Sequence, residues 1–155
     1  MKHIGIFAAL VIGTCAPVQA QTIDGSAVDE IVAIASNYGA ASLDVQTNGQ
    51  PRITGEVGGI GYQVFFLNCD SGVCEDLNFY AGFAALKPTM DSLNAWNREK
   101  RFGRAYLDAD LDAVIEYDIN LEYGVSPDNL NAAFGVWSLV LGEFAEHVGY
   151  ETRPQ

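Results

Sequence analysis

The sequence predicts an α+β domain in which an antiparallel sheet of about six strands carries an N-terminal helix and a long C-terminal helix. Three observations support this fold class. Apolar residues recur at helical spacing at both ends of the chain, they alternate with polar residues over short runs in between, and tight-turn residues separate those runs. Apolar residues make up 49% of the 155 residues, so the chain can build a hydrophobic core.

The first expected element after residue 20 is a helix. Ser26 and Asp29 resemble a capping box at its start, and Gly39 is suited to end it. One side of this helix is apolar, which predicts that it packs on the sheet. The apolar residues follow the spacing i, i+3, i+4 and i+7: Val28, Ile31, Val32 and Ala35.

Four strands with period-two alternation follow this helix. Asn48 with Gly49, and then Gly58 with Gly59, are typical of tight hairpin turns, and residues 70–72 predict a third turn. Short turns between successive strands indicate an antiparallel meander. The expected strands span 42–47, 53–57, 60–66 and 77–83.

The apolar period becomes helical again after Pro88. Thr89 is a suitable cap, and apolar residues at helical spacing predict a helix that ends near Lys100. Two more strands, 104–108 and 113–121, then form a hairpin around an acidic turn. The apolar residues of the helix are Met90, Leu93 and Trp96.

A long C-terminal helix closes the predicted fold. Ser126 is its expected cap, Pro127 occupies the first helical position, and Gly149 is suited to end it. A continuous apolar face predicts that this helix packs on the sheet. That face consists of Leu130, Phe134, Trp137, Leu141, Phe144 and Val148.

The first twenty residues are typical of a signal peptide. Lys2 precedes an apolar run from Ile4 to Ile12, and Val18 and Ala20 supply the small or modest side chains that signal peptidase requires before its cut. We therefore expect cleavage after Ala20 and a periplasmic or secreted protein.

The remainder of the chain is expected to hold one domain, residues 24–149, followed by a short tail, residues 150–155. A lipoprotein cut before Cys15 is an alternative to cleavage after residue 20. The apolar run of the signal is far shorter than the ~20 residues that cross a bilayer, so no stable membrane span is expected.

The charge of the chain narrows the choice of partners. The formal net charge is -12, and loss of residues 1–20 would remove Lys2 and no acid, leaving -13. Because a polyanion is repelled by such a chain, we expect no nucleic acid or anionic membrane partner.

Cys69 and Cys74 flank the expected turn at residues 70–72 and would face one another across a hairpin. We predict a structural disulfide between them, because the pair lacks the Cys-x-x-Cys spacing of redox-active thiols. Cys15 would leave with the signal peptide.

An acidic run resembles the start of a calcium-binding EF-hand loop. Such a loop requires glycine at its sixth position and glutamate at its twelfth, where this chain has Ala113 and Ile119. A solvated hairpin turn is therefore the favoured interpretation, and weak calcium binding is the alternative. The carboxylates concerned are Asp108, Asp110, Asp112 and Glu116.

A short basic segment supplies four of the seven lysines and arginines that follow residue 20. It is a candidate patch for an acidic partner or a phosphate group. The competing interpretation is that it balances the helix dipole and pairs with neighbouring acids. The four residues are Arg98, Lys100, Arg101 and Arg104.

Five segments within residues 24–148 carry a resemblance to a known family: 61–66, 77–83, 93–97, 101–108 and 124–126. They resemble the YbjN family, whose members are described as putative bacterial sensory transduction regulators. The resemblance implies a fold like that of type III secretion chaperones, with helices on an antiparallel sheet, and it supplies no catalytic residues. Unlike cytoplasmic relatives, this chain has an expected signal peptide and a cysteine pair.

These observations favour a non-enzymatic, exported binding or chaperone-like module whose partner is another protein or a second copy. We find no catalytic, cofactor or metal motif in the sequence and expect none of these sites. A hydrolase that uses carboxylates assembled by the fold, with Asp108, Asp110 or Glu116 in a cleft, is one alternative. A calcium-stabilised structural domain is the other.

Overall fold

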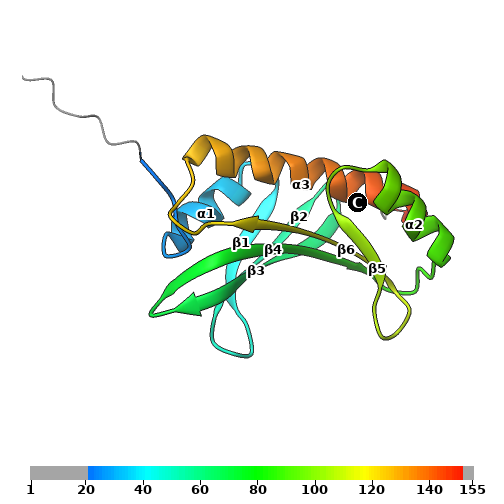
Figure 1. Cartoon of the computed structure of the whole chain (residues 1–155), viewed down its shortest axis with the longest axis horizontal. Coiled ribbons are helices and arrows are strands. Elements are labelled where there is room, and N and C mark those ends of the chain that lie inside the picture. The colour runs from blue at the N-terminus through cyan, green and yellow to red at the C-terminus, as the bar shows by residue number, and fades with distance from the viewer. Residues whose placement is uncertain (1–20, 152–155) are drawn as a thin grey trace, which may run out of the picture.

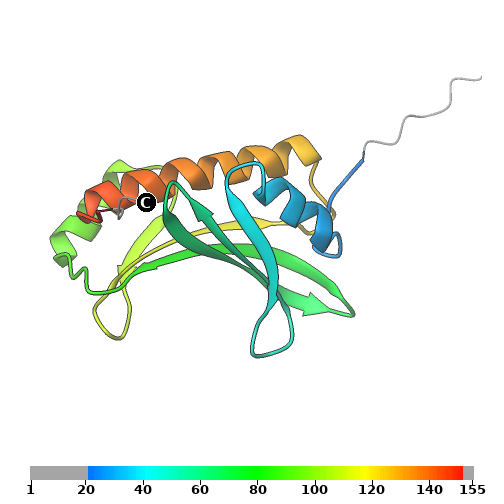
Figure 2. The same ribbon diagram turned by 180° about the vertical axis from the view of Figure 1, so that it is seen from behind.

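The computed structural model describes residues 21–151, which form one six-stranded antiparallel sheet with three helices on one side of it (Figures 1 and 2). The α+β class, the four-strand meander, the following helix and the final hairpin are all confirmed. In chain order the elements are α1 (Val28–Ala35), β1 (Ala40–Val45), β2 (Pro51–Val57), β3 (Ile60–Asp70), β4 (Val73–Phe83), α2 (Met90–Glu99), β5 (Arg104–Leu107), β6 (Ala113–Asn120) and α3 (Pro127–His147).

The strand order in the sheet is β1-β2-β3-β4-β6-β5. The final hairpin therefore joins the meander through its second strand: β6 pairs with β4 from Asp76↔Asn120 to Phe83↔Ala113, and β5 becomes an edge. β1 is the edge at the other end of the sheet.

The third and fourth strands are longer than the alternation predicted, because they continue past the buried part of the sheet to the turn at Ser71 and Gly72. Both turn residues have positive φ angles, 51° and 86°, as a tight two-residue hairpin requires. Beyond Phe66 the side chains of β3 are exposed or half-buried, so this extension carries no apolar signal.

The core lies between the sheet and the helices. Alternate residues of the strands face α3, whose apolar stripe is buried along the whole helix. Ser126 caps α3 by accepting a hydrogen bond from the Asn129 N–H, and Thr89 caps α2 in the same way from Ser92. The largest buried side chains include Trp96, Trp137, Phe66, Phe79, Phe134 and Phe144.

The prediction of a capping box at the start of α1 is wrong. The N-cap residue is Ala27, and it makes no side-chain cap. Ser26 instead donates its N–H and its hydroxyl to the Asp24 carboxylate, at 2.8 and 2.6 Å, and these hydrogen bonds lower the pKa of Asp24. Residues 24–27 thus form a turn of their own before the helix.

The predicted signal peptide, residues 1–20, and the last four residues of the predicted tail lie outside the described residues. Within residues 21–151, no helix combines the length and the apolar character that crossing a bilayer demands.

Candidate partner-binding groove

An apolar groove of about 190 Å³ lies between α2, α3 and the loop that connects α2 to β5. Its residues come from two parts of the chain about 40 positions apart, which the packing of the two helices brings together. The lining residues are Trp96, Lys100, Arg101, Phe102, Val136, Leu139, Val140 and Glu143.

Gly103 holds the connecting loop close to α3. Its φ angle is +79°, in the left-handed region that favours glycine, and an added Cβ would lie 2.7 Å from Val140 Cγ1 and 2.9 Å from Ile115 Cδ1. The Trp96 indole N–H donates to the Gly103 carbonyl oxygen at 3.2 Å, which ties the loop to α2 as well. Gly103 thus sets the position of the loop beside both helices.

Two apolar side chains of the groove remain exposed to solvent: Leu139 is 68% exposed and Phe102 is 43% exposed. Below them Trp96 is buried, and Phe102 also contacts Tyr117 with a ring-centroid separation of 6.0 Å. Grouped exposed apolar side chains beside a concave surface are typical of an interaction site.

Two cations border the groove. The Lys100 ammonium lies 5.5 Å from the Trp96 ring centroid and 2.8 Å from Glu143 Oε2. The Arg101 guanidinium lies 5.8 Å from the Phe102 ring centroid, and among the described residues it has no ion pair. Arg101 is thus the border cation that is available to a carboxylate of another molecule.

The structure divides the basic segment that the sequence singled out. Lys100 and Arg101 border the groove, whereas Arg98 pairs with Glu99 on α2. Arg104 lies on the helix-free face of the sheet, where it donates to Glu116 at 2.6 Å. Two of the four residues therefore share one site, and the other two belong to separate local ion pairs.

Leu139 was not among the residues that the sequence analysis selected. It lies two positions after Trp137 and two before Leu141, which places it about 200° around the helix from each of these buried side chains. The sequence does contain a signal for Leu139, namely a large apolar residue on the otherwise polar side of an amphipathic helix.

The acidic turn between β5 and β6 uses its carboxylates to hold its own backbone. Asp108 Oδ1 accepts the N–H groups of Asp110 and Asp112, both at 2.9 Å. Asp112 Oδ1 accepts the Ala85 N–H at 2.9 Å and pairs with Lys87. The turn is thereby tied to the segment that follows β4.

Glu116 does not contribute to this turn. Its carboxylate accepts hydrogen bonds from Tyr106 and Arg104 on the helix-free face of the sheet. Within residues 21–151, no three His, Cys, Asp or Glu side chains are grouped as a metal site would need. The carboxylates of the EF-hand-like run are thus not gathered at one point.

Asp108 and Asp112 do line a hollow of about 380 Å³ on the helix-free face of the sheet. Its lining also includes Gly61, Tyr80 and Gly82. Burial, together with the negative charges of Asp108, Glu116 and Asp112, raises the pKa of the Tyr80 hydroxyl.

Cys69 and Cys74 occupy opposite positions of the β3–β4 hairpin and are joined by a disulfide in the structure. Gly25 packs against this hairpin so closely that a Cβ there would lie 1.9 Å from the Cys74 carbonyl oxygen. The disulfide thus lies where the N-terminal segment meets the sheet.

The chain forms a small α+β domain with an apolar groove between α2 and α3. The family model described as "YbjN: Putative bacterial sensory transduction regulator" matches residues 27–149, and the chain belongs to this family. A search of curated proteins finds no match.

Among solved structures, the chain is similar to the type III secretion chaperone SycH of Yersinia pestis, whose crystal structure is of a complex with a stable fragment of YscM2. The two share 14% sequence identity, the likeness covers 74% of this chain and 98% of that chain, and the TM-score is 0.45.

Proposed function

We infer that this protein is an exported, non-enzymatic module that binds another protein at the groove between α2 and α3. The observation that carries the proposal is the exposure of Leu139 and Phe102 beside an apolar groove. A partner segment would place an apolar side chain in the groove and a carboxylate near Arg101. Such amphipathic segments commonly bind grooves between helices.

Export is supported by the signal-like pattern of residues 1–20 and by the cysteine pair, because structural disulfides persist mainly in oxidising compartments. In the periplasm or outside the cell, the partner would be another exported protein. The described carboxylates of the acidic turn bind backbone and neighbouring side chains, so the proposal assigns them a structural role.

The export step predicts a defined N-terminus. When the full chain is expressed in a bacterial host, mass spectrometry of the periplasmic fraction should find a protein that begins at Gln21. Ala20→Arg is the matched control, since a large cation at the position before the cut should block cleavage. An uncut protein from the unaltered gene would contradict the proposal, and a first residue at Cys15 would support the lipoprotein alternative instead.

The groove predicts a position-specific crosslink. A photoreactive amino acid in place of Leu139 should yield an adduct with a second protein in intact cells. The same residue in place of Tyr123, which is 93% exposed before α3 begins, is the control and should yield none. Crosslinked partners are identified by mass spectrometry.

Charge reversal tests the border of the groove. Arg101→Glu should lower the adduct yield at position 139, because it would repel the carboxylate of the partner. Arg98→Glu removes a cation of the same segment that already pairs with Glu99, and it should have a smaller effect. Equal yields at positions 139 and 123, or no adduct at either, would count against the groove as the binding site.

A further inference from the structure

The two edges of the sheet differ in how their backbone groups are satisfied. At the β5 edge, the Asn97 side chain donates to the Ala105 carbonyl oxygen and accepts the Ala105 N–H, both at 2.9 Å. Asn97 thus takes the place of a neighbouring strand at Ala105. No comparable side chain covers Ala41 or Leu43 at the β1 edge within the described residues.

The hairpin register shows which backbone groups of β1 point outward. The Gln46 N–H donates to the Gln50 carbonyl oxygen at 2.8 Å, and the next residue pair joins Val45 with Pro51, which has no N–H. Because hydrogen-bonded and non-hydrogen-bonded pairs alternate in an antiparallel ladder, Ala41, Leu43 and Val45 direct their N–H and C=O groups away from β2.

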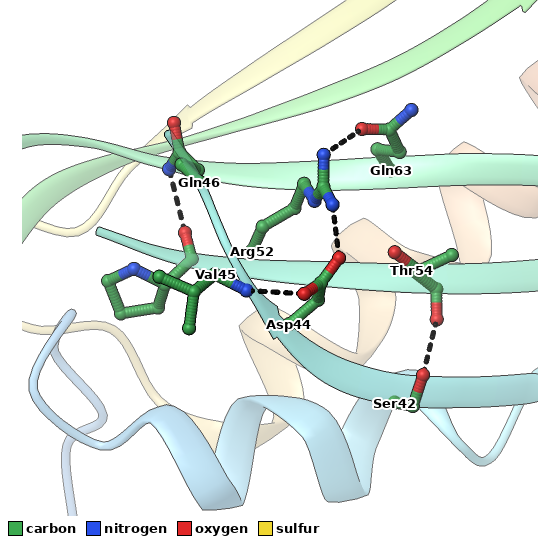
Figure 3. A network of polar contacts seen from close by, with 8 residues as sticks. Ser42, Asp44, Val45, Gln46, Arg52, Thr54 and Gln63 are labelled. Carbon is green, nitrogen blue, oxygen red and sulfur yellow. Dashed lines mark hydrogen bonds and ion pairs between the residues drawn. The ribbon is translucent and has the colours of Figure 1, made fainter. Parts of the chain in front are cut away.

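One of these outward groups already has a partner. The Val45 N–H donates to Asp44 Oδ1 at 2.7 Å, and the same carboxylate is held by Arg52, which also donates to Gln63 (Figure 3). The Arg52 guanidinium lowers the pKa of Asp44. Asp44 is therefore neutralised within its own sheet rather than repelling a second strand.

The β1 edge exposes large apolar side chains, as protein interfaces do. Leu43 is 49% exposed and Val45 is 60% exposed, and both lie on the helix side of β1. β1 contains no proline and no lysine, which are common means of keeping an edge strand from pairing with another chain. An open, apolar edge of this kind is a template for another strand.

We propose that β1 pairs antiparallel with β1 of a second copy of this chain, about a two-fold axis at Leu43, so that the two sheets become continuous. The choice of occupant rests on the self-complementarity of the strand. In this register Leu43 faces its own equivalent, Ala41 faces Val45, and Ser42 faces Asp44, so apolar residues meet on one face and no like charges lie opposite.

The backbone groups fit the same arrangement. Outward-pointing residues of one strand meet outward-pointing residues of the other, and Leu43 and its equivalent exchange two hydrogen bonds with Cα atoms about 5.5 Å apart. The Val45 N–H is released by Asp44, which keeps Arg52 as its partner. If the register shifted by one residue, outward-pointing residues of one copy would face residues of the other copy whose backbone groups already bond to β2. The hydrogen bonds between the two copies would then be lost.

The test is the mass of the purified protein in sedimentation equilibrium. The unaltered protein should sediment as a dimer, and Leu43→Lys should raise the dissociation constant by at least about tenfold, because two ammonium groups would meet at the axis. Leu111→Lys is the matched control: it makes the same change at an exposed leucine of the turn between β5 and β6, and it should leave the dimer intact. Circular dichroism checks that each variant is folded.

Hydrogen exchange provides a readout specific to strand pairing. The amides of Ala41 and Leu43 point outward in the monomer, so their exchange should slow as the concentration of unaltered protein rises. A monomer at the highest soluble concentration would overturn the proposal. A dimer that persists in folded Leu43→Lys, or one in which these two amides exchange freely, would also overturn it. A monomer that binds a strand of another protein at this edge would overturn it as well, because the occupant would not be a second copy.

Discussion

Replacing Trp137 with alanine should lower the free energy of unfolding by about 3 to 5 kcal/mol, as expected when a large buried aromatic side chain is removed from a packed core. Trp137 is 1% exposed in the middle of α3. Its ring lies 5.5 Å from that of Phe79 and 6.1 Å from that of Tyr62, measured between centroids. The substitution therefore leaves a cavity between α3 and the central strands.

Urea denaturation followed by circular dichroism measures this change. Trp137→Phe is the control, because it keeps an aromatic ring and removes an indole N–H that has no hydrogen-bond partner among the described residues. Loss of an unpaired buried donor offsets part of the lost packing, so the phenylalanine variant should be much less destabilised than the alanine variant. A change within experimental error for Trp137→Ala would show that this face of α3 is not buried.

Gly103→Ala should destabilise the protein by about 2 to 4 kcal/mol, since it adds a left-handed backbone penalty to a steric overlap. The added Cβ would lie 2.7 Å from Val140 and 2.9 Å from Ile115. Relief of this overlap moves the loop away from α3, so the crosslink at Leu139 should weaken as well. Stability is measured by thermal and urea denaturation.

Gly142→Ala is the matched control for this substitution. Gly142 lies in α3, and a Cβ built there meets no other atom within 4 Å. Alanine is favoured over glycine in a helix interior by about 1 kcal/mol, so this variant should be slightly stabilised. If both glycine variants are equally stable, the loop is not held by the close approach that the structure shows.

Much of the secondary structure could be predicted because its signals are local. Ser126 and Thr89 cap the helices that the sequence assigned to them, and Gly58 with Gly59 forms the predicted turn between β2 and β3. Ser26 failed as a predictor of the α1 cap because its side chain had a nearer partner, Asp24. A capping pattern in the sequence shows that a capping hydrogen bond can form. It does not form when another side chain nearby binds the same hydroxyl group.

The candidate site was predicted only in part. Lys100 and Arg101 were selected as cations, but the groove beside them also needs Leu139, which is 38 positions further along the chain than Arg101. The hydrogen bonds between Asn97 and Ala105 at the β5 edge could not be predicted from the sequence either, because no residue pattern around Asn97 indicates them. Both features depend on where α2 and α3 are placed relative to the sheet.

The sequence by itself determined the helices, the strands and most turns of this protein, since periodicity, caps and turn residues act over a few positions. Only the tertiary structure decided the order of β6 and β5, the groove between α2 and α3, and the contrast between a closed edge at Ala105 and an open one at Leu43. The physical reason is that these features arise from side-chain packing and backbone hydrogen bonds between residues distant in sequence, which no local pattern encodes.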